Sequence, residues 1–97
     1  MIFYNRFLTA EQIAGRCNFM DVSIVPPGTS IGEHTHADTE EEYYLIITGT
    51  GTMRRDGETF PVRAGDLIRN IPGGCHSLLN DGTDNIMMLV FELKVDL

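Results

Sequence analysis

The sequence predicts an all-β fold, a small sandwich or barrel built from about eight short strands. Three observations support this prediction. Apolar residues recur with a period of two along much of the chain, groups of Gly, Pro, Asn and Asp separate the apolar runs at close intervals, and only one short segment has a helical signal. A chain of 97 residues also suits a single domain with a modest core.

The first segment, residues 1–19, is expected to contain that short helix. In the stretch TAEQIAG, Thr9 can cap a helix, Gln12 completes a capping box and Gly15 can end the helix. The residues before it, MIFYNRFL, are too apolar for a free tail. We therefore expect this segment to pack on the barrel or on a partner chain, and residues 20–97 to form the barrel.

The next strands show the alternation clearly. In MDVSIV, the apolar residues Met20, Val22 and Ile24 share one face of a strand. The following VPPGTSIG interrupts this strand, because Pro26 and Pro27 cannot donate hydrogen bonds to a sheet. After an acidic stretch comes EYYLIIT, a β-rich run that is closed by glycines.

The second half of the chain alternates apolar runs with turns. TMRRDGETFPV predicts a hairpin whose loop, Asp56-Gly57, has a preferred sequence for a type I′ turn. RAGD then leads into LIRNI, PGG into CHSLLN, and DGTDN into the final run IMMLVFEL. The final run is apolar on both faces from Ile86 to Phe91, so both faces should be covered. We therefore expect a homodimer.

Composition narrows the function classes. A net charge of −7 argues against nucleic acid and against an anionic membrane surface as partners. No apolar run approaches the roughly 20 residues of a membrane span, and no signal peptide is recognised, so a cytoplasmic protein is expected. Cys17 and Cys75 do not make a disulfide framework, and we expect both to be reduced.

Two of the three histidines, His34 and His36, lie one residue apart. In a strand, residues i and i+2 project from the same face, so both imidazoles can point at one place. Imidazole binds Fe, Zn, Ni, Mn and Cu, and a neighbouring carboxylate could complete a site. The plain alternative is a pair of solvated histidines in a polar loop. His76 adds weight to a metal, because distant strands face one another across a small barrel.

The spacing of these residues resembles that of the cupins. Their first motif is G-(five)-H-x-H-(three or four)-E-(six)-G, and here five residues separate Gly28 from His34. Their second motif is G-(five)-P-x-G-(two)-H-(three)-N, and here GDLIRNIPGGCHSLLN runs from Gly65 to Asn80. The proline is shifted by one residue in this chain, while three residues still separate His76 from Asn80. The resemblance covers roughly residues 20–93.

The resemblance implies a jelly-roll-like double-stranded β-helix with one divalent metal ion near its mouth. His34, His36, His76 and one glutamate would bind the metal, leaving a position open for water or a small-molecule ligand.

The glutamate that this motif selects depends on whether residues are counted forward from His36 or back from Gly49. Six residues separate Glu42 from Gly49, which selects Glu42 by strand register, and Glu41 remains possible if the strand carries a bulge. The other glutamates of the run are expected in a solvated acidic loop. Tyr44 shares the strand parity of Glu42 and either lines the pocket or fills the barrel.

Three function hypotheses follow from the resemblance, because this fold does not fix function. The first is a metal-dependent enzyme, such as a dioxygenase or isomerase, acting on a small polar organic molecule. The second is a non-catalytic barrel that binds or senses a small, sugar-like ligand. The third is a structural metallo-barrel. Arg69 and Asn70 could meet a carboxylate substrate, although a surface salt bridge is expected there, and Asn80 is expected to support a turn.

Overall fold

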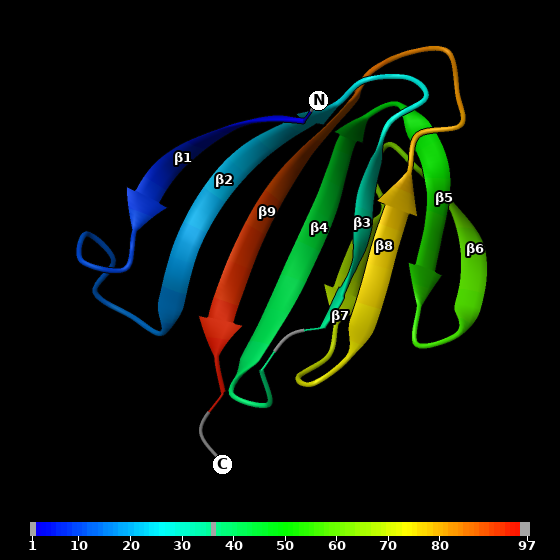
Figure 1. The fold of residues 1–97 in the computed structure, drawn as a ribbon. Coiled ribbons are helices and arrows are strands. Elements are labelled where there is room, and N and C mark those ends of the chain that lie inside the picture. Colours follow the sequence, from blue (N-terminus) through cyan, green and yellow to red (C-terminus); the bar gives the residue numbers. More distant parts are fainter. Residues whose placement is uncertain (1, 36, 96–97) are drawn as a thin grey trace.

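The computed structural model describes residues 2–35 and 37–95, without the side chains of Glu33 and His34. The described residues form nine strands and no helix, arranged as two facing sheets (Figure 1). The strands are β1 Phe3–Thr9, β2 Cys17–Val25, β3 Ser30–Thr35, β4 Glu40–Thr48, β5 Thr50–Arg55, β6 Glu58–Arg63, β7 Leu67–Asn70, β8 Cys75–Leu79 and β9 Ile86–Lys94. In this part of the chain no helix is long and apolar enough to cross a membrane.

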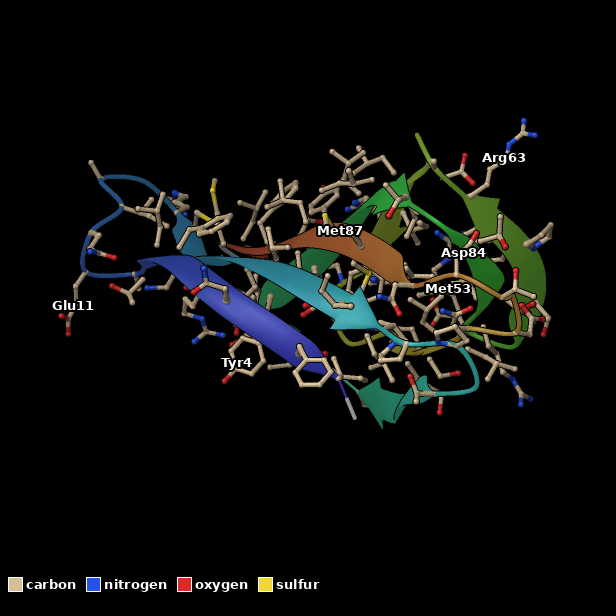
Figure 2. The ribbon with its side chains drawn as sticks, turned by 90° about the horizontal axis from the view of Figure 1, so that it is seen from above. Tyr4, Glu11, Met53, Arg63, Asp84 and Met87 are labelled. Atoms are coloured by element: carbon tan, nitrogen blue, oxygen red, sulfur yellow. The ribbon has the colours of Figure 1, made fainter. Side chains whose placement is uncertain are left out.

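The topology is that of a jelly roll. One sheet has the strand order β1-β2-β9-β4-β7, the other has the order β3-β8-β5-β6, and the paired strands are antiparallel. From β2 to β5, successive strands alternate between the sheets, which places the chain around a common interior. The predicted all-β fold class is therefore confirmed. Figures 1 and 2 show that β1 and β2 extend beyond the edge of the four-stranded sheet.

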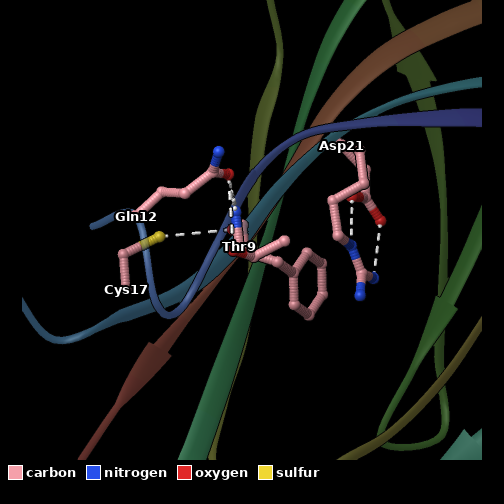
Figure 3. A network of polar contacts seen from close by, with 6 residues as sticks. Thr9, Gln12, Cys17 and Asp21 are labelled. Carbon is pink, nitrogen blue, oxygen red and sulfur yellow. Dashed lines mark hydrogen bonds and ion pairs between the residues drawn. The ribbon is translucent and has the colours of Figure 1, made fainter.

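The predicted N-terminal helix is wrong. One of the two hydrogen bonds of its capping box forms, since the Thr9 backbone N–H donates to the Gln12 Oε1 at 3.0 Å (Figure 3). However, it closes only one turn, in which the Gln12 N–H donates to the Thr9 carbonyl. Pairing of β1 with β2 already takes Thr9 into the sheet, and the short connection to Cys17 leaves too few residues to offset the cost of helix nucleation.

The hairpin prediction is confirmed. Asp56 and Gly57 connect β5 to β6 and have φ angles of 50° and 84°, the positive values that a type I′ turn requires. Asp56 also fixes the hairpin to β8, because its carboxylate accepts a hydrogen bond from the Cys75 N–H at 2.9 Å. The turn therefore helps to hold the start of β8, the strand that carries His76.

The apolar core fills one end of the space between the sheets. Its fully buried members include Val25, Ile46, Met53, Ile86 and Met88. Figure 2 shows Met53 inside the sandwich and Met87 on the outer side of the five-stranded sheet. This assignment follows from strand alternation, which sends neighbouring methionines of β9 to opposite faces.

Strand β2 turns its polar face inward. Met20, Val22 and Ile24 share one face as predicted, but they lie half-buried on the outer side of the sheet. The inner face carries Asp21 and Ser23, both buried. The interior of the fold is therefore polar toward the end where β2 starts.

Candidate metal centre

The polar end of the interior is built from rows of residues that pair across the strands. Glu42 on β4 lies opposite Asn70 on β7 and opposite Glu92 on β9, and these three residues are all buried. Residues that pair in this way share one face of the sheet. One row across the inner face therefore carries two carboxyl groups and an amide.

His76 faces this row from the other sheet. Its Nε2 lies 3.1 Å from Glu42 Oε1 and 3.2 Å from the Tyr44 hydroxyl, and its side chain is 1% exposed. The rings of Tyr44 and His76 meet edge to face, with centroids 5.5 Å apart. Two of the predicted metal ligands, Glu42 and His76, are thus in direct contact between the sheets.

The remaining predicted ligands lie on β3 and in the segment after it. The backbone of His34 lies directly opposite that of His76 in the β3–β8 ladder. The side chain of His34 and the whole of His36 lie outside the described residues. Within residues 2–35 and 37–95, no group of three or more His, Cys, Asp or Glu side chains has a geometry suited to a metal ion.

The run of three glutamates belongs to β4 and not to a solvated loop, so that part of the prediction is wrong. Strand alternation turns Glu42 inward and Glu41 outward. Glu41 accepts a hydrogen bond from the Tyr43 hydroxyl and forms an ion pair with Arg69, with 2.7 Å between Arg69 Nη2 and Glu41 Oε2. Although burial opposes it, these contacts lower the pKa of Glu41. Of the two candidate glutamates, Glu42 is the one that contacts His76.

Tyr44 lies against both candidate ligands. Burial, together with the charge of Glu42, raises the pKa of the Tyr44 hydroxyl well above its usual value. The hydroxyl therefore keeps its proton at neutral pH and serves as a hydrogen-bond donor within the site.

An open cleft of about 270 Å³ adjoins these residues, with Arg6, Asp21, Ser23, Glu42 and Tyr44 in its lining. Arg6 reaches over from β1 and binds the Asp21 carboxylate through two hydrogen bonds of 2.8 and 3.1 Å, drawn as dashed lines at Asp21 in Figure 3. The guanidinium also stacks on Phe19, 4.3 Å from the ring centroid. Larger clefts elsewhere on the surface do not include Glu42 or His76.

Glu92 adds a further carboxyl group to the same interior. Burial raises the pKa of Glu92, the hydrogen bond from the Asn18 amide opposes this shift, and the charge of Glu40 reinforces it. The sequence contained a signal for this residue, because Glu92 shares strand parity with Ile86, Met88 and Val90 and so faces inward with them.

The described carboxyl groups and His76 are donor types that a divalent cation accepts. Asp21, Glu42 and Glu92 all place carboxyl groups inside the fold, and Arg6 offsets the charge of Asp21. Buried carboxylates are costly without a nearby positive charge. Glu42 and His76 present an oxygen and a nitrogen donor in contact, the ligand types that transition metals accept.

Similarity to known proteins agrees with the fold and the motifs. Residues 21–92 match the family model described as "Cupin domain". The oxalate-binding protein of Thermotoga maritima is 37% identical over 82 residues, which are 84% of this chain and 67% of that protein. The polyketide synthase CurC of Streptomyces cyaneus is 40% identical over 87 residues, 90% of this chain and 55% of that protein.

A solved structure is similar over nearly the whole chain. It is the crystal structure of a predicted oxalate decarboxylase from Thermotoga maritima, with a TM-score of 0.92 and 28% identity over 97% of this chain and 81% of that one. The chain therefore belongs to the cupin family. It spans between 55% and 67% of the length of the two curated relatives described above.

Proposed function

We propose that this cupin binds one divalent metal ion through His34, His36, Glu42 and His76, and that it is a metal-dependent enzyme acting on a small polar organic molecule. The observation that supports this most is the buried contact between Glu42 and His76 in an interior with further carboxyl groups. His34 occupies the ladder position opposite His76, which suits a shared site. Fe, Zn, Ni, Mn and Cu all fit such a nitrogen and oxygen set.

The surrounding residues have distinct roles in this proposal. The metal supplies Lewis-acid or redox chemistry of the dioxygenase or isomerase type. Tyr44 orients His76, and its hydroxyl, which burial keeps protonated, can donate a hydrogen bond to a ligand oxygen. Arg6, held by two hydrogen bonds to Asp21, also lines the cleft, and its remaining N–H groups can donate hydrogen bonds to an anionic ligand.

The second candidate function is binding of a small acid without turnover. It is favoured by the relative whose name is oxalate-binding protein. A cleft of about 270 Å³ is also of a size for a ligand with only a few heavy atoms. The two candidates share the metal and the cleft, and they differ only in whether bound ligand is converted.

We also propose that residues 1–19 join the 20–97 barrel to a second copy of the chain in a cytoplasmic homodimer. Two features support this. Strand β1 extends beyond the facing sheet and exposes Phe3, Tyr4 and Phe7. The outer face of the five-stranded sheet is apolar and half-buried, with Tyr43 stacked on Phe91. Sedimentation at micromolar concentration tests this arrangement, and a monomer would contradict it.

The metal proposal is tested by titrating metal-free protein with Mn²⁺ or Zn²⁺ in a calorimeter, and then adding oxalate. Wild type is expected to bind about one metal per chain and to bind oxalate only afterwards. Glu42→Gln should lose at least about 100-fold in metal affinity. Glu41→Gln, its neighbour on the other face, is the matched control and should bind metal as wild type does.

Equal metal binding by wild type and Glu42→Gln, or none by wild type, would overturn the proposal. Turnover then separates the two candidates. Conversion of a small acid or sugar by the loaded protein supports the enzyme, and binding without conversion supports the second candidate.

A further inference from the structure

Asn70 is a buried amide whose polar atoms are unmatched. Asn70 is the last residue of β7, and it is 1% exposed. Among the residues that the structure describes, neither the Asn70 Nδ2 nor its Oδ1 has a hydrogen-bond partner. Most buried polar side-chain atoms in folded proteins are hydrogen-bonded, so two unmatched atoms in one side chain need an explanation.

The position of Asn70 places this amide at the candidate metal centre. Asn70 pairs with Glu42 in the β4–β7 ladder, and opposite residues have Cβ atoms about 4.5–5.5 Å apart on the same face. Two residues earlier on the same face of β7, Ile68 belongs to the apolar core. Asn70 is therefore the residue at which the inner face of β7 changes from apolar to polar.

Asn80 is a second buried asparagine, and its side chain has a structural role. Asn80 is 0% exposed, and its Nδ2 donates to the carbonyls of Val25 and Asp84 at 2.7 and 2.8 Å. Its Oδ1 accepts a hydrogen bond from the Gly82 N–H at 3.0 Å. The two asparagines are almost equally buried, but among the described residues only the Asn80 side chain makes hydrogen bonds that support the fold.

We propose that Asn70 is a ligand-binding residue, and that it takes a small organic acid carrying both a hydrogen-bond acceptor and a hydroxyl donor. This inference rests on the proposed function, because the ligand lies beside Glu42. The amide offers an N–H donor and a carbonyl acceptor side by side. An α-hydroxy acid matches both groups, whereas fully ionised oxalate matches only the donor.

The proposal makes opposite predictions for two matched substitutions in the full chain without metal. Asn70→Leu removes unmatched polar atoms in favour of an apolar side chain of similar size, so the melting temperature should rise by about 4–8 °C. Asn80→Leu breaks three hydrogen bonds and should lower it by at least as much. A lower melting temperature for Asn70→Leu would overturn the proposal, because Asn70 would then serve the fold.

Ligand binding is then measured by thermal shift, with Mn²⁺ alone and with Mn²⁺ plus glycolate or oxalate. Wild type should be stabilised by Mn²⁺ and further by glycolate, at lower concentration than by oxalate. Asn70→Leu should keep the Mn²⁺ shift and lose the glycolate shift. A glycolate shift of unchanged size in Asn70→Leu overturns the role of Asn70. Absence of any Mn²⁺ shift in wild type overturns the proposed metal function instead, and the stability order of the two leucine variants still decides whether Asn70 serves the fold.

The wild-type protein provides a measurement that does not depend on a variant folding. With ¹⁵N-labelled asparagine and bound Zn²⁺, the side-chain amide signals of Asn70 should move on titration with glycolate, while those of Asn80 should stay in place. Asn70 signals that do not move would overturn the proposal.

Discussion

The two ends of the interior are formed by the same strands and differ in chemistry. Strand β4 contributes Ile46 at one end and Glu42 at the other, and β8 contributes Leu78 and then His76. On β7 the change falls between Ile68 and Asn70. Alternate residues of a strand stay on one face, so each strand runs from apolar core to polar site without leaving the interior. Under our proposal one end serves stability and the other serves binding, so substitutions should separate the two.

The largest stability effect is expected in the apolar end. Met53 is fully buried, and Met53→Ala should lower the free energy of unfolding by about 2–5 kcal/mol, because it removes buried apolar surface and leaves a cavity. Chemical denaturation measures this loss. The metal content of the folded fraction should stay at the wild-type value, and its loss in Met53→Ala would show that the two ends are not independent.

Gly49→Ala should also affect stability alone. Gly49 has a φ of 91°, and a Cβ there would lie 2.6 Å from the Asn85 carbonyl oxygen. The substitution forces a backbone shift beside Ile86 at the apolar end, and we expect a loss of about 2–3 kcal/mol. Urea denaturation provides the measurement. A neutral effect would indicate that this end of the sandwich is loosely packed.

Tyr44→Phe tests the boundary between the two ends. The ring packs in the apolar core while the hydroxyl contacts His76, so only a polar contact is removed. The free energy of unfolding should fall by about 1 kcal/mol, and the metal content should not change. If Tyr44→Phe lost its metal, the hydroxyl would have to be part of the binding set and not a group that orients His76.

The smallest effect is expected on the outer face of the polar end. Folding lowers the pKa of Glu41 from its ordinary value of 4.5, so the ion pair with Arg69 stabilises the fold above that pH and is lost as the pH falls through the lowered pKa. Glu41→Gln should lower the melting temperature at pH 7 by no more than about 4 °C. Melting curves at pH 7 and pH 3 should differ less in this variant than in wild type.

Much of the fold was predictable because it depends on local patterns. Period-two alternation and turn residues predicted the strands from β2 onward except β3, whose first residues were expected in the break after β2. The Asp56-Gly57 pair predicted the hairpin. The N-terminal helix failed because the capping box of Thr9 and Gln12 is a local signal, whereas the pairing of β1 with β2 is not. The pairing of Thr9 with β2 prevented the helix from forming, because a short helix cannot offset its nucleation cost.

The site was only partly predictable, for the same reason. Motif spacing singled out His76 and the choice between Glu41 and Glu42, and strand register places Glu42 beside His76. The alternation in β2 showed a polar and an apolar face without showing that Asp21 faces inward. For Arg69 and Asn70 we expected a surface salt bridge and left contact with a carboxylate substrate open, and no sequence pattern indicated that Asn70 is buried.

The most direct measurement is the metal content of three proteins after reconstitution under reducing conditions: wild type, His76→Ala and Met53→Ala. Both alanine substitutions empty a fully buried position, so Met53→Ala controls for lost packing. We predict about one metal per chain in wild type and Met53→Ala, and none in His76→Ala. No metal in wild type, or equal metal in all three, would contradict a metal centre at the polar end of the barrel.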